Sequence, residues 1–263
     1  MRTMTWLTAA LGCFLIAGCA GIAPAPTQEQ RQALAPIGKL RVALYLGAPA
    51  SIVRGTTLDD SKGVGFDLGK ELARRLGVPF EPIAYPSPGA IVNGLKAGEW
   101  DVTFFGPNPE RESLLIFTAP FLVIEHGYLV PAGSRISTID AADQAGVRIG
   151  APQGGSVNAL LTRRIKNATV VASPSVPAGE ELLKSGKVEV FAANKANLFE
   201  LSDKMPGSRV LDGRIGVDEV AIAIPKGREG GMAYLRQYIA DIKSEHLVEA
   251  AVQRAGLRGA ANE

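Results

Sequence analysis

With 263 residues, the chain is long enough for one large domain or for two lobes that each bury a core. Apolar residues make up 46% of it and charged residues 21%, which is ordinary globular composition. The formal net charge is +2 and no basic block stands out, so the sequence lacks the electrostatic footprint of a nucleic-acid-binding protein.

The N-terminus has the pattern of an exported lipoprotein. Arg2 precedes an apolar run over residues 6–17 that is too short to span a bilayer as a relaxed helix, which indicates an export signal. The run ends in the sequence LIAGC at 15–19, which resembles the bacterial lipobox, where signal cleavage precedes a diacylated cysteine. We therefore predict a lipoprotein signal peptide over 1–18 and lipidation of Cys19. The alternative is an ordinary secreted protein with an unmodified Cys19.

Residues 19–37 are rich in Ala, Pro and Gln and show no hydrophobic period, so we predict that they form an acylated tether. The other cysteine, Cys13, lies inside the signal, which leaves the folded part without a thiol and without a disulfide. Two or more acyl chains make a stable anchor. We expect a protein held at a membrane by its lipid, in the periplasm or at the cell surface.

From residue 38 onward, strand and helix patterns alternate. In the first block, Leu68, Leu72 and Leu76 recur at four-residue spacing before Gly77, which fits a helix stop. The order strand, helix, strand, helix, strand predicts a parallel sheet with right-handed crossovers. The predicted strands are Leu40–Tyr45, Phe80–Tyr85 and 101–105, and the predicted helices are 65–76 and 90–97.

The same alternation restarts near residue 147, and two extended apolar stretches, 121–130 and 217–224, are predicted to cross between the blocks. We therefore predict an α/β protein of two lobes, 38–126 with 224–258 and 127–223. Each lobe would hold a mostly parallel sheet flanked by helices, with the two crossing strands as the hinge. The second block is predicted to contain strands at 147–150, 168–172 and 188–191 and helices at 156–165 and 178–184, and helices at 232–242 and 247–252 to return to the first lobe.

Six short motifs stand in a fixed order along this framework. They are GKLRV at 38–42, GFDL at 65–68, LKAGEWD at 95–101, FTAPF at 117–121, GVRIG at 146–150 and QGGS at 153–156. Their order and spacing resemble the family 3 bacterial solute-binding proteins, the polar amino-acid group of periplasmic binding proteins, over roughly 38–257. The resemblance implies a type II, two-lobe fold with the ligand in the cleft, and delivery of that ligand to an ABC importer.

The resemblance also implies that Arg111, six residues before Phe117, clamps a ligand carboxylate. The chemistry fits, because a guanidinium offers a planar fork of donors that meets a carboxylate bidentately. The loop before Arg111 is about two residues shorter than in well-known members. The alternative is a solvated arginine at a helix start, paired with Glu110 or Glu112.

Further candidates lie in that loop and in the strand before it. Backbone groups of Gly106 and Asn108 would add hydrogen bonds to the head of the ligand. Alternate residues of a strand face opposite sides, so one of Phe104 and Phe105 is predicted to be core and the other to line the cleft. Tyr45 is the aromatic residue nearest to the first loop, where family members often carry one.

In the second lobe, Gly155 and Ser156 precede a helix whose free N–H groups and positive end attract anions. The alternative is that Ser156 caps the helix, and both can hold at once. Asn194 is a departure, because family members that bind amino acids usually place an Asp here to pair with the ammonium. The ligand is therefore either an amino acid bound without that charge or a carboxylate that lacks the amino group.

We expect the extracytoplasmic solute-binding component of an ABC importer, a monomer that binds an amino acid or a related small carboxylate without turning it over. His126 and His246 are the only histidines and are far apart, so neither a metal nor a cofactor is expected. One alternative is an enzyme similar to cyclohexadienyl or arogenate dehydratases, for which Glu125 is a candidate acid. The other is a ligand-sensing lipoprotein without a permease.

Overall fold

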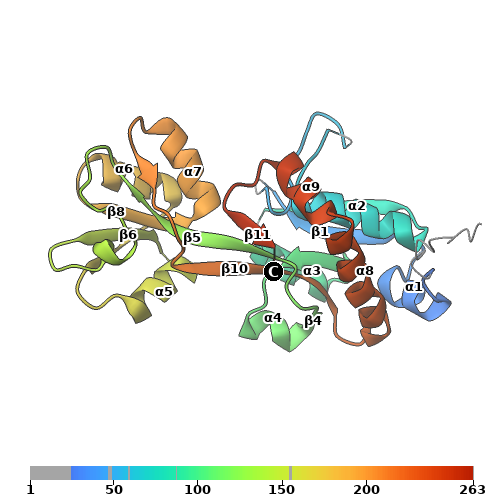
Figure 1. Cartoon of the computed structure of the whole chain (residues 1–263). Coiled ribbons are helices and arrows are strands. Elements are labelled where there is room, and N and C mark those ends of the chain that lie inside the picture. The colour runs from blue at the N-terminus through green and yellow to red at the C-terminus, as the bar shows by residue number, and fades with distance from the viewer. Residues whose placement is uncertain (1–24, 47–48, 59, 87, 154–155, 263) are drawn as a thin grey trace, which may run out of the picture.

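The computed structural model describes residues 25–46, 49–58, 60–86, 88–153 and 156–262. Two groups of helices and strands lie at opposite ends of the molecule, and two long strands, β5 (Leu122–Val130) and β10 (Gly216–Pro225), run between them (Figure 1). The predicted α/β class is therefore confirmed, with two lobes joined by crossing strands. No helix within these residues combines the length and the apolar character that crossing a membrane requires.

The first lobe contains a sheet in the order β2-β1-β3-β10, with β4 also paired to β10. β1 pairs in parallel with β2 and β3, whereas β10 runs antiparallel to β3 and β4. Its elements are β1 (Leu40–Tyr45), α2 (Val64–Leu76), β2 (Phe80–Tyr85), α3 (Pro88–Lys96), β3 (Val102–Phe105), α4 (Pro109–Leu114), β4 (Leu115–Phe117), α8 (Met232–Ser244) and α9 (Leu247–Ala255).

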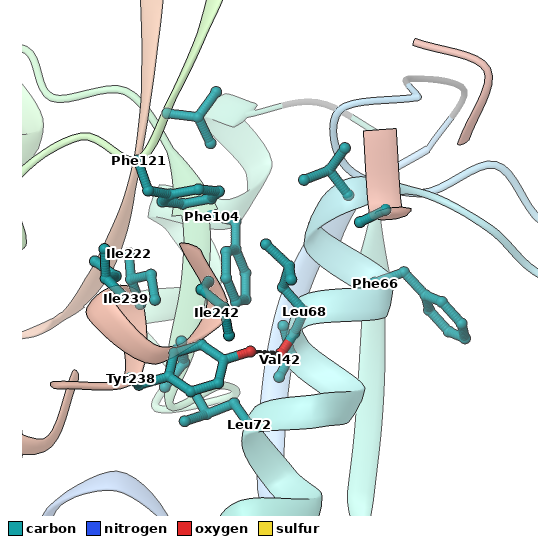
Figure 2. Close-up of a cluster of buried hydrophobic side chains, with 14 of the residues drawn as sticks. Val42, Phe66, Leu68, Leu72, Phe104, Phe121, Ile222, Tyr238, Ile239 and Ile242 are labelled. Atoms are coloured by element: carbon teal, nitrogen blue, oxygen red, sulfur yellow. Dashed lines mark hydrogen bonds between the residues drawn. The ribbon is translucent and has the colours of Figure 1, made fainter. Parts of the chain in front are cut away.

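The core of the first lobe joins α2 to α8, which are far apart in the sequence. Leu68 and Leu72 of α2 are buried, and the helix stops at Gly77, whose φ of 69° is left-handed and favours glycine. The hydroxyl of Tyr238 in α8 donates a hydrogen bond to the Leu68 carbonyl oxygen (Figure 2). Ile242 of the same helix is fully buried in this cluster. These contacts hold α8 and α9 on the first lobe.

The second lobe repeats the design with a sheet in the order β5-β8-β6-β7. β6 pairs in parallel with β7 and β8, and β5 runs antiparallel to β8. Its elements are β6 (Arg148–Pro152), α5 (Ser156–Arg164), β7 (Thr169–Ser173), α6 (Val176–Lys184), β8 (Val190–Asn194), α7 (Lys195–Lys204) and β9 (Arg209–Val210), with short 3-10 turns at Asp140–Ala142 and, in the first lobe, Glu229–Gly231.

β5 and β10 pair antiparallel where they cross between the lobes, with His126 opposite Gly216 and Leu122 opposite Val220. A strand that the sequence did not predict, β11 (Ala260–Asn262), pairs with the opposite edge of β5. The crossing point is therefore built from three antiparallel strands, and it lies next to the space between the lobes.

The predicted tether over 19–37 is wrong from Thr27 onward, because a helix, α1 (Gln28–Leu34), begins there. Thr27 and Gln30 cap its first turn reciprocally: each backbone N–H donates to the side chain of the other, at 2.9 and 3.2 Å. At its other end Leu34 is fully buried in the core of the first lobe. A capping box and one buried leucine thus make part of the predicted tether a component of the fold. The predicted signal peptide, Cys19 and Gly155 lie outside the described residues.

Candidate functional site

A cavity of about 660 Å³ lies between the lobes, beside the crossing strands. Residues of both lobes and of β10 line it. Seven of the eight predicted ligand-binding residues are among them, namely Tyr45, Phe105, Gly106, Asn108, Arg111, Ser156 and Asn194. The eighth, Gly155, is outside the described residues. The structure therefore brings segments from four distant parts of the sequence to one cleft.

Arg111 is positioned by the loop that precedes it. Asn108 caps α4, and its Oδ1 accepts a hydrogen bond of 2.8 Å from the Arg111 N–H. The guanidinium Nη1 donates to the carbonyl oxygen of Gly106 at 2.6 Å, and Cζ lies 4.2 Å from the centre of the Phe105 ring. Such a cation–π contact favours a fixed guanidinium plane. Three neighbours thus hold the side chain that the sequence singled out.

Arg111 keeps most of its donors for a ligand. Of the five N–H groups of a guanidinium, only one has an acceptor among the described residues. The predicted alternative, a pair with Glu110 or Glu112, does not form within the described part of the chain. Burial lowers the pKa of Arg111 from its usual value, although nearby Glu110, Tyr45 and Asp218 act to raise it. The side chain therefore remains a partly desolvated cation at the cleft.

The loop over 106–108 supports the arginine as well as lining the cleft. The Gly106 carbonyl and the Asn108 side chain are both engaged, with Arg111 and with the start of α4. Gly106 also passes close to β10, because a Cβ at this position would lie 2.6 Å from the Glu219 carbonyl oxygen. Glycine is thus required for the close approach of this loop to the hinge strand.

Phe104 and Phe105 do not divide the two predicted roles, because both side chains are buried in core clusters and both line the cavity. Phe104 packs edge to face on Phe121, with ring centroids 6.2 Å apart, inside the core of the first lobe (Figure 2). Phe105 stacks on Phe117, and the Arg111 guanidinium also lies over the Phe105 ring. Both rings reach the cavity, but Phe105 is the one that contacts the candidate ligand-binding cation.

The second lobe contributes the starts of two helices. Ser156 is the first described residue of α5 and is exposed at the cleft. Asn194 ends β8 and caps α7, and its Oδ1 accepts a hydrogen bond of 3.0 Å from the Asn197 N–H. The cap uses one lone pair of the Asn194 side-chain oxygen, so the amide nitrogen and the second lone pair of the oxygen remain for a ligand.

Sequence reasoning missed Asp218, a carboxylate on β10 that lines the same cavity. Its Oδ2 lies 3.0 Å from Nε2 of the buried His126. Burial acts to raise the pKa of Asp218, but His126, the Ser156 hydroxyl and the charge of Arg111 together hold it below its usual value. Two adjacent acidic residues, Asp218 and Glu219, in an otherwise apolar crossing stretch are the signal that could have found it.

Tyr45 ends β1 at the cleft, and its surroundings connect the two charged residues. Burial raises the pKa of Tyr45, Asp218 raises it further, and Arg111 lowers it. The phenol is therefore within the field of both charges. By contrast, Glu125 accepts a hydrogen bond of 2.7 Å from Nζ of Lys195 and does not line the cavity.

Residues 40–255 match the family of bacterial extracellular solute-binding proteins, family 3. No curated protein matches the chain. Among solved structures, an amino acid ABC transporter substrate-binding protein from Streptococcus pneumoniae bound to L-arginine is 19% identical, with 87% of this chain and 98% of that chain covered and a TM-score of 0.63.

Two further structures have the same architecture. A protein from Wolinella succinogenes complexed with lysine is 20% identical, with 83% of this chain and 95% of that chain covered and a TM-score of 0.67. An ancestral amino-acid-binding protein, described as a precursor of cyclohexadienyl dehydratase, is 16% identical, with coverages of 85% and 97% and a TM-score of 0.65. At these identities the similarity shows the fold, the type II architecture of periplasmic binding proteins.

Proposed function

Because the chain belongs to the bacterial extracellular solute-binding proteins of family 3, we propose that it is the solute-binding component of an ABC importer. It binds an amino acid or a related small carboxylate in the cleft between its lobes. The observation that carries this proposal is Arg111, a cation at the cleft whose plane is fixed by Phe105 and Gly106 and whose other donors are free for a carboxylate within the described structure.

Binding proceeds in two stages in this proposal. Arg111 on the first lobe takes the ligand carboxylate bidentately. The second lobe then closes, and bending at β5 and β10 brings Ser156 and Asn194 of the helix starts toward the same ligand. The ligand shifts the equilibrium toward the closed form because only that form offers contacts from both lobes.

The proposal extends to the location of the protein. The family is extracellular, and the LIAGC sequence at 15–19 supports lipid attachment at Cys19 after export. An acylated chain in the periplasm or at the cell surface stays near the membrane that holds its permease. We propose that it acts there as a monomer without a cofactor.

Binding without turnover fits the cleft better than dehydration does. A dehydratase needs an acid with a raised pKa to protonate a leaving hydroxyl. Asp218, which lines the cavity, has a lowered pKa and is ionised, and Glu125 is engaged by Lys195 and does not line the cavity. A ligand-sensing role would use the same cleft, and uptake of labelled ligand by cells with and without the protein separates it from transport.

The test is titration calorimetry of the purified protein against the protein amino acids and their deaminated counterparts, with Arg111→Met, Arg111→Lys and Arg135→Met variants. Arg135 is exposed on the second lobe, so Arg135→Met removes the same charge at a position outside the cleft. We expect Arg111→Met to weaken binding at least about 100-fold, Arg111→Lys to retain part of the affinity, and Arg135→Met to match wild type. Equal affinity in Arg111→Met and wild type would overturn the assignment.

A further inference from the structure

The cleft contains one carboxylate whose role the family match does not supply. Asp218 stands on the hinge strand β10, opposite Ile124 of β5, and lines the cavity with 39% of its side chain exposed. A carboxylate has about four lone-pair positions, and among the described residues its closest charged contact is His126, whose Nε2 lies 3.0 Å from Oδ2. The remaining positions are available to a donor that enters the cavity.

Asp218 faces a cation across the cleft without being neutralised by it. Arg111 and Asp218 act on each other electrostatically, yet no direct ion pair joins them in the described structure. Tyr45 is influenced by both charges, so all three groups surround a common region of the cavity. Two opposite charges held apart in this way match a ligand that carries a negative and a positive group of its own.

Asn194 does not supply the negative charge that would pair with a positive group of the ligand. Its side-chain oxygen already accepts the hydrogen bond that caps α7, and the amide brings no negative charge to the cleft. A neutral amide stabilises an ammonium group less than a carboxylate does. The acidic partner that Asn194 fails to provide is present instead on the hinge strand.

We propose that Asp218 binds the ammonium group of the ligand, so that the cleft selects α-amino acids over carboxylic acids that lack the amino group. The inference rests on the proposed function, since it takes Arg111 as the partner of the carboxylate. A deaminated acid would leave Asp218 without its ligand partner, because it brings a negative carboxylate into the cleft without the positive ammonium group.

His126 has a positioning role in this arrangement. Its ring is buried between β5 and β10, and a Cβ on Gly216 would lie 3.3 Å from its Nδ1. The 3.0 Å contact between Nε2 and Oδ2 of Asp218 restrains one carboxylate oxygen. The Asp218 side chain is then already ordered before the ligand arrives. Binding therefore costs less side-chain conformational entropy.

The experiment compares matched pairs on the full chain purified in detergent. Each protein amino acid is titrated beside its deaminated counterpart, for example L-leucine with isocaproate, L-glutamate with glutarate and L-lysine with ε-aminocaproate. The variants are Asp218→Asn, which keeps the shape and removes the charge, and Asp212→Asn, which makes the same change at an exposed residue that does not line the cavity. Thermal unfolding of each variant without ligand checks that it is folded.

We expect wild type to bind an amino acid at least about tenfold more tightly than its deaminated counterpart. Asp218→Asn should lose roughly 10- to 100-fold in affinity for the amino acid and keep or gain affinity for the deaminated acid, while Asp212→Asn matches wild type. If wild type binds both members of a pair equally, or Asp218→Asn weakens both equally, the role of Asp218 is overturned and the carboxylate-binding function stands. If no carboxylate binds to wild type, both proposals are overturned.

Discussion

The guanidinium of Arg41 holds the carboxylate of Asp101 with two hydrogen bonds, Nε to Oδ2 at 2.9 Å and Nη2 to Oδ1 at 2.8 Å. Arg228 adds a third at 2.7 Å, and the Asp101 side chain is fully buried. Arg148 and Glu189 repeat the pair in the second lobe at 2.5 Å, but there both side chains are more than one third exposed. The first pair ties β1 to the residue that precedes β3, and the second ties β6 to the residue that precedes β8.

The two pairs should differ sharply in their contribution to stability. Asp101→Asn leaves the charges of Arg41 and Arg228 without their buried partner, which costs about 3–5 kcal/mol. Glu189→Gln opens a partly solvated pair and should cost about 1 kcal/mol or less. Urea unfolding of both variants measures the difference. Equal losses would mean that burial does not decide the strength of this repeated contact.

Acid should weaken the protein through Asp101. Burial acts to raise the pKa of its carboxyl, but the hydrogen bonds and charges of Arg41 and Arg228 hold it below its usual value. A depressed pKa stabilises the folded state fully above the unfolded value, about 3.9, and that stabilisation is lost as the pH falls through the folded pKa. The free energy of unfolding of wild type should therefore fall more steeply below about pH 4 than that of Asp101→Asn. Parallel pH profiles would contradict this.

Leu34 should prove to be part of the folded core. It is fully buried beneath the Glu229–Gly231 turn, and a Cβ on Gly231 would lie 2.6 Å from its side chain. Leu34→Ala should cost about 2–5 kcal/mol of unfolding free energy, whereas Ile37→Ala, at a side chain that is 57% exposed, should change it by less than about 0.5 kcal/mol. A loss of the same size in both variants would argue against a specific core role for Leu34.

Much of the fold follows from hydrophobic periodicity, because the strands and helices of each lobe bury one or both faces. The four-residue spacing of Leu68 and Leu72 correctly marks the buried face of α2. The helix at Thr27–Leu34 escapes this logic, since one buried leucine in seven residues gives no period. Only the reciprocal cap of Thr27 and Gln30 marks it.

The cleft was predictable where motifs in loops point to it, as with Arg111 and Asn108. Asp218 was not, because its exposure to the cavity depends on how β10 pairs with β5, and a shift of one residue would turn it to the other face. That register is set by contacts between segments about ninety residues apart, which no local pattern encodes. The same reason hides β11, whose pairing partner is β5.

Phe105 should affect affinity through Arg111. Phe105→Leu removes the ring beneath the guanidinium, so the arginine is less firmly oriented and binding of the amino acid should weaken about 3- to 10-fold. Phe117→Leu is the matched control, because Phe117 stacks on Phe105 but does not line the cavity. Both variants should lose stability to a similar degree, and only Phe105→Leu should lose affinity. Equal affinities of the two variants would show that the ring does not orient Arg111.

Asn194→Asp should strengthen the preference for amino acids. Aspartate caps a helix about as well as asparagine, so α7 should keep its N-terminal hydrogen bond and the unfolding free energy should stay within about 0.5 kcal/mol of wild type. The second carboxylate oxygen would add negative charge at the cleft, which attracts an ammonium group and repels a deaminated acid.

The measurement is the ratio of dissociation constants for an amino acid and its deaminated counterpart. We expect Asn194→Asp to raise this selectivity about tenfold over wild type. Asn194→Ala serves as the control, since it removes the cap at a cost of about 1 kcal/mol in stability without adding a charge. An unchanged selectivity in Asn194→Asp would mean that the start of α7 does not reach the ligand, and that discrimination between the two classes depends on the hinge strand.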